Sequence, residues 1–499
     1  MASEFTKTIT VSGGNIRGRI EENICVYKGI PYAAPPVGDL RWRAPQQVKA
    51  WEGTRDCTEW ADSPIQAPQD AFLMWTKEFI IDNRNYSEDC LYLNVWTADD
   101  DFEGKPVIVF FHGGNLVSGG TSCEVYDGKN IARRGAVYVS VGFRVGILGL
   151  LSSTELSAEN DRHVSGNYMV LDQIEALKWV RDNIASFGGD PGNVTITGLS
   201  SGGNNVNALC ISPLAKGLFG RAFAMSFINY GIMEAKGGWI RLEDAQKAGD
   251  AMISGRSLDE MRKLPAEEIL KMSYPSNICI DGYIIKEDYT DAVNNGRTDD
   301  IDYIMGMVTG DGLMYRLIGF GQKVTALEGI EKIKEFFGPD AEEALGIYPV
   351  DEENPDGIFT VMGHDAMLTS LHMFARKRSA RTSKNTYIYE LSHVMPGPES
   401  AMYGAFHSSD MPYFWGVLSD ERKEYWTDTD RKYAEELCGI LVSYAKTGAV
   451  DGSKEWAASN GDDYCVIGSE GIKRAQMDER IRNLWVAAID RNYKKLWNK

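Results

Sequence analysis

Two adjacent serines lie in a glycine-rich stretch whose spacing could support nucleophilic chemistry. The stretch TGLSSGG, residues 197–203, fits the pattern G-x-S-x-G in one register, with Ser200 at its centre. Between a strand and a helix, this pattern forms a tight turn that exposes the central serine, and the backbone N–H of the next residue faces the place where an acyl oxyanion forms. We therefore predict Ser200 as a nucleophile and Ser201 as a backbone donor. An ordinary glycine-rich turn is the alternative.

A second glycine-rich stretch, HGGNL at residues 112–116, follows the apolar run 106–111. Glycines at the end of a strand let backbone amides approach a substrate closely, as an oxyanion hole requires. We predict that the amides of Gly114 and Asn115 belong to such a hole, together with the amide of Ser201. A glycine turn without a catalytic role is the alternative, and we expect His112 to be a buried structural residue.

The surrounding sequence predicts the elements that would hold these two stretches. Short β-branched or aromatic runs predict buried strands at residues 90–97, 106–114 and 136–143, and the serines follow a further apolar run at 194–196. Apolar residues recur at helical spacing from Leu171 to Ile184, which predicts one amphipathic helix ending before Gly188. Strand, helix and strand in this order favour a right-handed crossover and a largely parallel sheet, which is an α/β architecture.

The rest of the chain carries no repeat, low-complexity tract or linker that would divide it. From about residue 241 to residue 380 the pattern is helical and charged, which predicts a helical insertion that covers one edge of the sheet. We therefore expect a single domain over residues 1–499, with about 241–380 as an insertion or cap region within it.

Composition and charge exclude several classes of protein. With 499 residues, of which 43% are hydrophobic and 11% aromatic, the chain can bury a large core. The formal net charge of −19 opposes binding to nucleic acid, which needs a basic face. No run approaches the roughly eighteen apolar residues of a membrane span. No cysteine or histidine spacing suits zinc, so we expect neither a metal nor another cofactor.

The N-terminus, MASEFTKTITVSGG, shows no secretion signal. We therefore expect a cytoplasmic protein, and secretion stays open if the opening residues replaced a native signal peptide. The eight cysteines are scattered along the chain, and we expect most of them to be buried thiols outside disulfides.

Five segments closely resemble the type-B carboxylesterases, the family that includes the cholinesterases and p-nitrobenzyl esterases. They are VYKGIPYAAPPVGDLRWRAPQ (26–46), SEDCLYLNVW (87–96), the HGG stretch, SGNYMVLDQIEALKWVRDNIASFGGDPGNVTITG (165–198) and GAFHSSDMPYFWG (404–416). The resemblance covers nearly the whole chain and is sparse between about residues 240 and 380. It implies an α/β-hydrolase fold, with a mostly parallel central sheet flanked by helices, and a serine hydrolase that cleaves carboxylic esters through an acyl-enzyme intermediate.

The resemblance also implies the rest of a catalytic triad. His407, in GAFHSSDMPYFWG, matches the family's catalytic histidine. The family's acid is a glutamate in a segment whose counterpart here is GMVTGDG, residues 306–312, and this places Asp311 at the glutamate position. Aspartate is one methylene shorter, so the loop that carries it must sit closer to the histidine. Asp410 is the next candidate for the acid.

Other matches to the family concern its scaffold. Arg41 with Glu88, and Arg144 with Asp172, match charged pairs that brace the family fold. Cys90 matches one half of a disulfide in secreted relatives, but the partner position near SPIQAPQ holds no cysteine. This departure favours an intracellular, bacterial-type esterase.

Several departures from the family pattern fall where the resemblance places the pocket. Asn115 and Leu116 stand in place of a glycine and an aromatic residue, and Leu199 and Ser201 in place of a glutamate and an alanine. We predict an altered and more apolar pocket lined by Leu116, Gly142, Met169, Leu199, Phe227 and Ile228. Ordinary divergence and a site remodelled by evolution or engineering are both compatible with these changes.

Ester hydrolysis on a small-molecule ester is the expected activity. A repurposed site on the same fold, such as an acyltransferase, is one alternative, and a non-catalytic binding protein is another. Adhesion members of the family typically lack the nucleophile, whereas Ser200 and His407 are present here. The residues define neither the natural substrate nor the oligomeric state.

Overall fold

The structure is a computed structural model that describes residues 5–100, 102–231, 239–316, 323–451 and 453–497. The chain forms two compact units, each with its own hydrophobic core. The first unit comprises Met1–Phe223, Trp239–Asp288 and Met411–Asp451, and the second comprises Ala224–Gly238, Tyr289–Asp410 and Gly452–Lys499.

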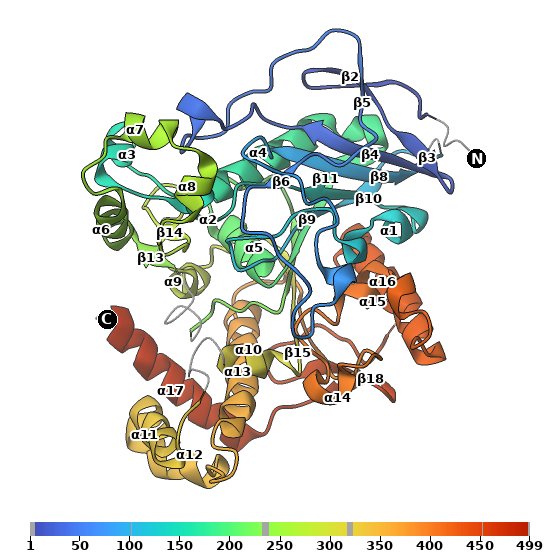
Figure 1. Cartoon of the computed structure of the whole chain (residues 1–499). Coiled ribbons are helices and arrows are strands. Elements are labelled where there is room, and N and C mark those ends of the chain that lie inside the picture. The colour runs from blue at the N-terminus through green and yellow to red at the C-terminus, as the bar shows by residue number, and fades with distance from the viewer. Residues whose placement is uncertain (1–4, 101, 232–238, 317–322, 452, 498–499) are drawn as a thin grey trace. The chain divides into compact units, whose positions relative to one another are not determined.

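The first unit is built on a mixed sheet with the strand order β12-β11-β9-β10-β8-β4-β3 (Figure 1). Strands β11, β9 and β10 are mutually parallel, whereas β8, β4 and β3 are antiparallel to their neighbours. Strands β9 and β10 are buried along their whole length, as expected where helices cover both faces of a parallel sheet. The strands of this unit are β1 (Ile9–Val11), β2 (Gly14–Arg17), β3 (Arg19–Glu21), β4 (Ile24–Pro31), β5 (Thr54–Asp56), β6 (Ser63–Pro64), β7 (Tyr86–Ser87), β8 (Tyr92–Ala98), β9 (Lys105–Phe111), β10 (Val137–Val141), β11 (Gly189–Leu199), β12 (Arg221–Met225, which continues into the second unit), β13 (Ile240–Arg241) and β14 (Cys279–Ile280).

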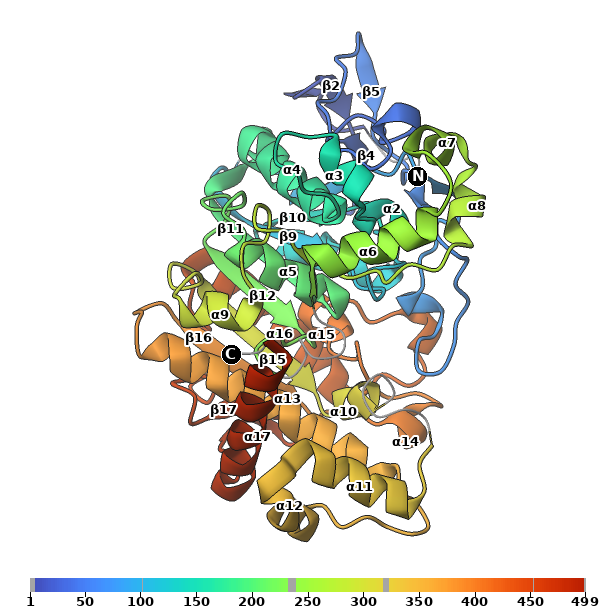
Figure 2. The ribbon, with the colours of Figure 1, turned by 90° about the vertical axis from the view of Figure 1, so that its left-hand side faces the viewer.

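Helices cover both faces of this sheet. Helices α4 and α5 pack together and against β11, and α1 and α16 pack together on the opposite face (Figure 1). Helices α6, α7 and α8 lie beside α2 and α3 (Figure 2), around a core that includes Trp42, Leu151 and Met261. The helices of this unit are α1 (Lys129–Arg133), α2 (Gly146–Leu150), α3 (Thr154–Ala158), α4 (Tyr168–Asn183), α5 (Ser201–Ile211), α6 (Leu242–Ile253), α7 (Leu258–Lys263), α8 (Ala266–Leu270), α15 (Met411–Trp415) and α16 (Asp428–Thr447).

In the second unit, β15 (Asp302–Val308), β16 (Thr386–Leu391) and β17 (Tyr464–Gly468) are parallel, and β18 (Gly471–Ala475) is antiparallel to β17. Helices α13 and α17 pack against each other, with α11 and α12 beside α17 (Figures 1 and 2). Their core includes Phe337, Tyr348 and Trp485, and the Trp485 indole donates a 2.7 Å hydrogen bond to the Tyr348 hydroxyl. The helices of this unit are α9 (Tyr289–Asn294), α10 (Asp311–Tyr315), α11 (Ala326–Phe337), α12 (Ala341–Ile347), α13 (Gly357–Ser379), α14 (Ser400–Tyr403) and α17 (Glu479–Trp497).

These elements confirm the predicted α/β fold class. The three predicted strands correspond to β8, β9 and β10, and the predicted amphipathic helix is α4 followed by a 3₁₀ turn that ends at Gly188. The prediction of a largely parallel sheet omitted its antiparallel strands. A strand–helix–strand pattern indicates parallel crossovers, whereas antiparallel neighbours need no helix between them. The segment 241–380 holds helices α6 to α13 and also strands β14 and β15.

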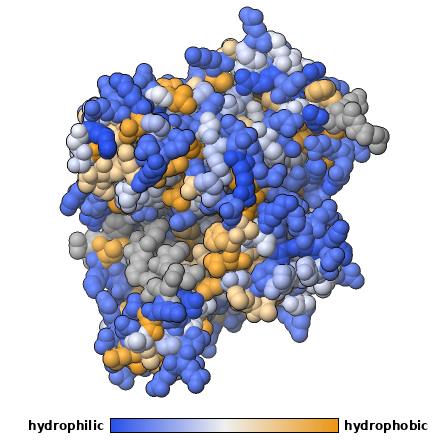
Figure 3. All heavy atoms as spheres, viewed as in Figure 1, coloured by the Kyte–Doolittle hydropathy of each residue, from blue (hydrophilic) through white to orange (hydrophobic). Residues whose placement is uncertain are grey.

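The described residues contain no helix that is long and apolar enough to cross a bilayer. Most residues on the face drawn in Figure 3 are hydrophilic, as expected from the high net charge.

Both predicted charged pairs are present in the first unit. The Arg144 guanidinium, just after β10, donates to both carboxylate oxygens of Asp172 on α4 at 2.8 and 2.6 Å, and its third nitrogen donates to the Arg43 carbonyl at 2.8 Å. Both side chains are buried. The pair therefore fixes the end of a central strand to the helix that precedes β11.

Replacing Asp172 by alanine should leave the Arg144 charge buried without its carboxylate, and we expect a loss of about 3–5 kcal/mol in the free energy of unfolding. Asp182→Ala is the matched control, because Asp182 lies on the same helix in a half-exposed ion pair with Arg181, and it should cost no more than about 0.5 kcal/mol. Urea unfolding of the two variants measures the difference. Equal losses would show that the buried pair does not brace the sheet.

Candidate active site

Ser200 occupies the turn between β11 and α5, as the sequence predicted. Its backbone has φ 57° and ψ −127°, a conformation that L-residues rarely adopt. A Cβ atom on Gly198 would lie 2.3 Å from the Gly202 carbonyl oxygen, and one on Gly202 would lie 2.1 Å from the Phe111 carbonyl oxygen. Only glycine fits at these two positions, so the chain can turn sharply at Ser200 and place it at the N-terminus of α5.

The loop that follows β9, residues 112–119 (the HGGN loop), lies directly against this turn. A Cβ atom on Gly113 would approach the Leu199 carbonyl oxygen to 2.9 Å and the Ser200 Cβ to 3.3 Å. Gly114, Asn115 and Leu116 all have positive φ angles, of 119°, 56° and 63°. The loop that follows β9 therefore passes within contact distance of Ser200 in a conformation with two consecutive left-handed non-glycine residues.

His112 has the structural role that the sequence predicted. Its ring stacks on Phe143 with the ring centroids 4.2 Å apart, and its Nδ1 lies 2.8 Å from the Gly113 carbonyl oxygen. Burial lowers the pKa of His112 to about 4, so the ring is neutral, and the carbonyl can only accept a hydrogen bond. Nδ1 is consequently the protonated nitrogen and donates to Gly113.

Asp311 and His407 are in direct contact within the second unit. The His407 Nδ1–H donates to Asp311 Oδ1 at 2.5 Å, and Asp311 Oδ2 accepts from the Val308 backbone N–H at 3.0 Å. Burial alone would lower the pKa of His407, but the charge of Asp311 and this hydrogen bond outweigh it, so the pKa is raised above its ordinary value. Asp311 begins α10, immediately after β15.

The two loops meet closely, as the shorter aspartate requires. The Gly310 N–H donates to the Ala405 carbonyl at 2.8 Å, and a Cβ atom on Gly310 would lie 2.4 Å from the same oxygen. This backbone contact joins the loop of Asp311 to that of His407.

Asp410 has a different partner. Its Oδ2 accepts a 2.7 Å hydrogen bond from the Tyr389 hydroxyl, and the residue is completely buried. Burial, together with the nearby charge of Asp311, raises the pKa of Asp410 to about 6. Asp311, rather than Asp410, therefore holds the imidazole of His407.

The other predicted pocket residues are distributed over both units. Leu116 and Leu199 are buried next to the HGGN loop and the serine turn, and Met169 is fully buried on α4 beside Gly149. Gly142 donates its N–H to the Tyr92 carbonyl at 2.9 Å, at the end of β10. In the second unit, Ile228 is fully buried and Phe227 is half-buried.

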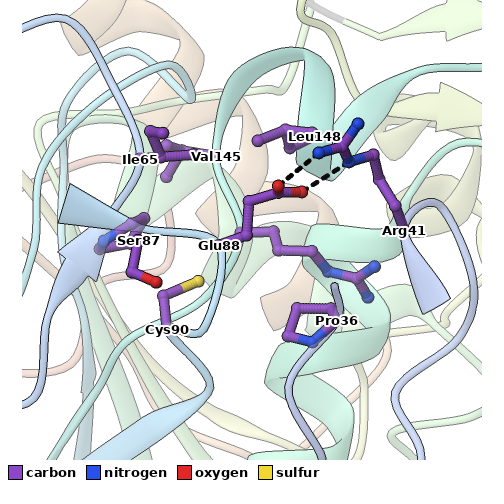
Figure 4. A pocket seen from close by; sticks show the side chains of 10 residues that line it. Pro36, Arg41, Ile65, Ser87, Glu88, Cys90, Val145 and Leu148 are labelled. Atoms are coloured by element: carbon purple, nitrogen blue, oxygen red, sulfur yellow. Dashed lines mark hydrogen bonds and ion pairs between the residues drawn. The ribbon is translucent and has the colours of Figure 1, made fainter. Parts of the chain in front are cut away.

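A pocket in the first unit is built around the other predicted ion pair (Figure 4). The Arg41 guanidinium donates to both oxygens of Glu88, at 2.7 and 2.5 Å, and also to the carbonyls of Met261 and Leu264. The sulfur of Cys90 borders this pocket. The lining includes the guanidiniums of Arg41 and Arg144, whose charges are neutralised by Glu88 and Asp172. The pocket is therefore part of the scaffold.

All eight cysteines are buried thiols outside any disulfide, as predicted. Where secreted relatives would carry the second cysteine, Ser63 and Pro64 of β6 pair with Tyr86 and Ser87 of β7. Backbone hydrogen bonds thus close the base of the segment 63–87. Two residues of this segment that the sequence did not predict, Gln66 and Gln69, bind the HGGN loop at Gly119 and Ser118.

The chain matches the Carboxylesterase family over residues 6–484. It is 31% identical over 468 residues to the para-nitrobenzyl esterase of Bacillus subtilis (strain 168), covering 88% of this chain and 90% of that protein. It is 27% identical over 495 residues to the phenmedipham hydrolase of Pseudarthrobacter oxydans, covering 93% and 96%. A fumonisin B1 esterase of Sphingopyxis macrogoltabida is 29% identical over 467 residues, with 88% and 81% covered.

Solved structures agree with these relatives. A structure of a PNB esterase superimposes with a TM-score of 0.81 at 26% identity, covering 96% of this chain and 99% of that one. A thermophilic PNB esterase superimposes with a TM-score of 0.80 over the same shares. With the serine turn, the HGGN loop and the histidine–aspartate pair in place, the chain belongs to the carboxylesterase family and is an α/β-hydrolase that cleaves carboxylic esters.

Proposed function

We propose that Ser200, His407 and Asp311 form the catalytic triad of this esterase. The observation that carries the proposal is the short hydrogen bond from His407 Nδ1–H to Asp311 Oδ1. With Nδ1 donating, Nε2 is the nitrogen that accepts a proton in the neutral imidazole. A serine hydroxyl needs such a base and a carboxylate to orient that base.

The proposed reaction has two halves. His407 Nε2 takes the hydroxyl proton as Ser200 Oγ attacks the ester carbonyl, and the resulting imidazolium returns the proton to the departing alcohol. Water then attacks the acyl-enzyme with the same assistance and releases the acid. The amides of Gly114, Asn115 and Ser201 hold the negative oxygen in both halves, and losing one such donor costs about 10²–10³ in rate.

The proposed substrates are small or aromatic carboxylic esters. Support comes from the names of the relatives, which act on para-nitrobenzyl esters, phenmedipham and fumonisin B1. We propose that Leu116, Gly142, Met169, Leu199, Phe227 and Ile228 line the pocket. Leucine at 199 adds apolar surface where relatives carry a carboxylate, which favours uncharged groups. No observation favours the acyltransferase or binding-protein alternatives.

We further propose that residues 1–499 work as one catalytic domain, with about 241–380 as the cap region, and that the protein acts in the cytoplasm. The eight buried thiols support this location, because disulfides are rare in reducing compartments.

The nucleophile assignment is tested by single-turnover reaction with p-nitrophenyl acetate and butyrate. Wild type and Ser201→Ala should both give a burst of p-nitrophenol and an acylated peptide, because Ser201 contributes only its backbone amide. Ser200→Ala should give neither. Acylation that survives in Ser200→Ala, or its absence in wild type, would contradict the proposed function.

The His407–Asp311 pair predicts how kcat/KM depends on pH. Only neutral His407 can act as the base, and its pKa is raised by Asp311, so kcat/KM should fall on the acid side with an apparent pKa above the ordinary value of about 6.5. Asp311→Asn should move this limb to lower pH and reduce kcat by about 10²–10⁴.

Asp410→Asn is the matched control for this experiment. It removes a second buried charge that also raises the pKa of His407 but leaves the Asp311 hydrogen bond in place. The acid limb of the kcat/KM profile should therefore move to lower pH, with a much smaller loss of kcat. A larger loss in Asp410→Asn than in Asp311→Asn would reverse the assignment of the acid.

A further inference from the structure

The Gly114 carbonyl oxygen accepts hydrogen bonds from two backbone N–H groups and one hydroxyl. It accepts hydrogen bonds from the backbone N–H groups of Val117, at 3.1 Å, and Ser118, at 3.0 Å, and from the Ser118 hydroxyl at 2.9 Å. The peptide between Gly114 and Asn115 is planar and trans, so its C=O and N–H point in opposite directions. Fixing the carbonyl toward Val117 and Ser118 therefore fixes the Asn115 N–H on the opposite side, where it can serve as an oxyanion donor.

The Ser118 hydroxyl is held in turn by Gln69, whose Nε2 donates to Ser118 Oγ at 2.6 Å. Because the hydroxyl hydrogen is directed to Gly114, the serine oxygen can only accept from Gln69, and an amide NH₂ is the matching donor. The three groups thus form a directional chain from Gln69 through Ser118 to Gly114.

Gln69 belongs to the segment 63–87, whose ends are joined by the pairing of β6 with β7 and not by a disulfide. Gln66 of the same segment binds both backbone groups of Gly119, at 2.7 Å each. The loop itself contains two consecutive residues, Asn115 and Leu116, in the left-handed region. Such strain persists only where neighbours fix it, and the segment supplies two side chains that do so.

We propose that Gln69 is a positioning residue for the oxyanion hole: it orients the Ser118 hydroxyl on the Gly114 carbonyl and thereby aims the Asn115 N–H at the acyl oxygen. This inference rests on the proposed function, in which that N–H is a donor. Gln69 touches neither substrate nor Ser200 in this scheme. Its effect should consequently fall on the transition state and leave substrate binding almost unchanged.

The test combines Gln69→Leu, Ser118→Ala and the double variant, assayed with p-nitrophenyl butyrate under steady-state and single-turnover conditions. Each single variant should lower kcat and the acylation rate by about 10- to 100-fold, short of the 10²–10³ expected for complete loss of a donor, with KM within about twofold. If Gln69 acts through Ser118, the double variant should be no slower than Ser118→Ala.

Gln69→Glu tests whether Gln69 acts as a hydrogen-bond donor. A carboxylate cannot donate, and it would draw the Ser118 hydroxyl hydrogen away from Gly114, so this variant should be at least as slow as Gln69→Leu. Gln46→Leu is the matched control, because the Gln46 side chain is exposed and donates to the carbonyls of Ala44 and Pro45, outside the oxyanion loop. It should leave kcat and KM unchanged. If Gln69→Leu does not fold, Gln69→Met keeps the length without the donor.

Three results would overturn the inference: losses that multiply in the double variant, a raised KM with kcat retained, or a fully active Gln69→Leu. Each presumes a wild type that acylates at Ser200. A wild type that fails to acylate would instead overturn the proposed function, so the two failures are distinguishable.

Discussion

The backbone at Ser200 is the constraint on which the rest of the proposed site depends. Its positive φ is strained; such a conformation costs about 1–3 kcal/mol and persists only where the surrounding structure determines it. Strand β11 and helix α5 enter and leave the turn directly, and Gly198 and Gly202 allow backbone contacts that no side chain could tolerate. The same turn places the serine at the positive end of α5, which favours negative charge on a bound substrate.

The proposed site also includes the HGGN loop and the His407–Asp311 pair, and different hydrogen bonds hold each of them. The HGGN loop is held by carbonyls: His112 donates to Gly113, and Ser118 donates to Gly114, so successive peptide planes are fixed by side chains outside the reaction. The His407–Asp311 pair is held by the contact between Gly310 and Ala405, which brings the two loops close enough for the shorter aspartate side chain to reach the imidazole. In both cases backbone hydrogen bonds set the geometry of the reactive groups.

Much of this arrangement could be predicted from the sequence. The G-x-S-x-G spacing and the flanking periodicities predict the strand, turn and helix around Ser200, because each signal is local. His407 and Asp311 are 96 residues apart, and no local pattern pairs them, so their partnership required resemblance to a family. The antiparallel strands β3 and β4 and the contacts of Gln66 and Gln69 were missed, because they depend on long-range packing that leaves no periodicity in the chain.

The central claim is that Ser200, the HGGN amides and His407 act on one acyl group. A crystal structure of the enzyme inactivated with an alkylphosphonate p-nitrophenyl ester tests it directly. We predict phosphorus bonded to Ser200 Oγ, a phosphoryl oxygen at about 2.7–3.1 Å from the amides of Gly114, Asn115 and Ser201, and His407 Nε2 directed at the adduct. Phosphorus on another residue, or a phosphoryl oxygen turned away from those amides, would contradict the account.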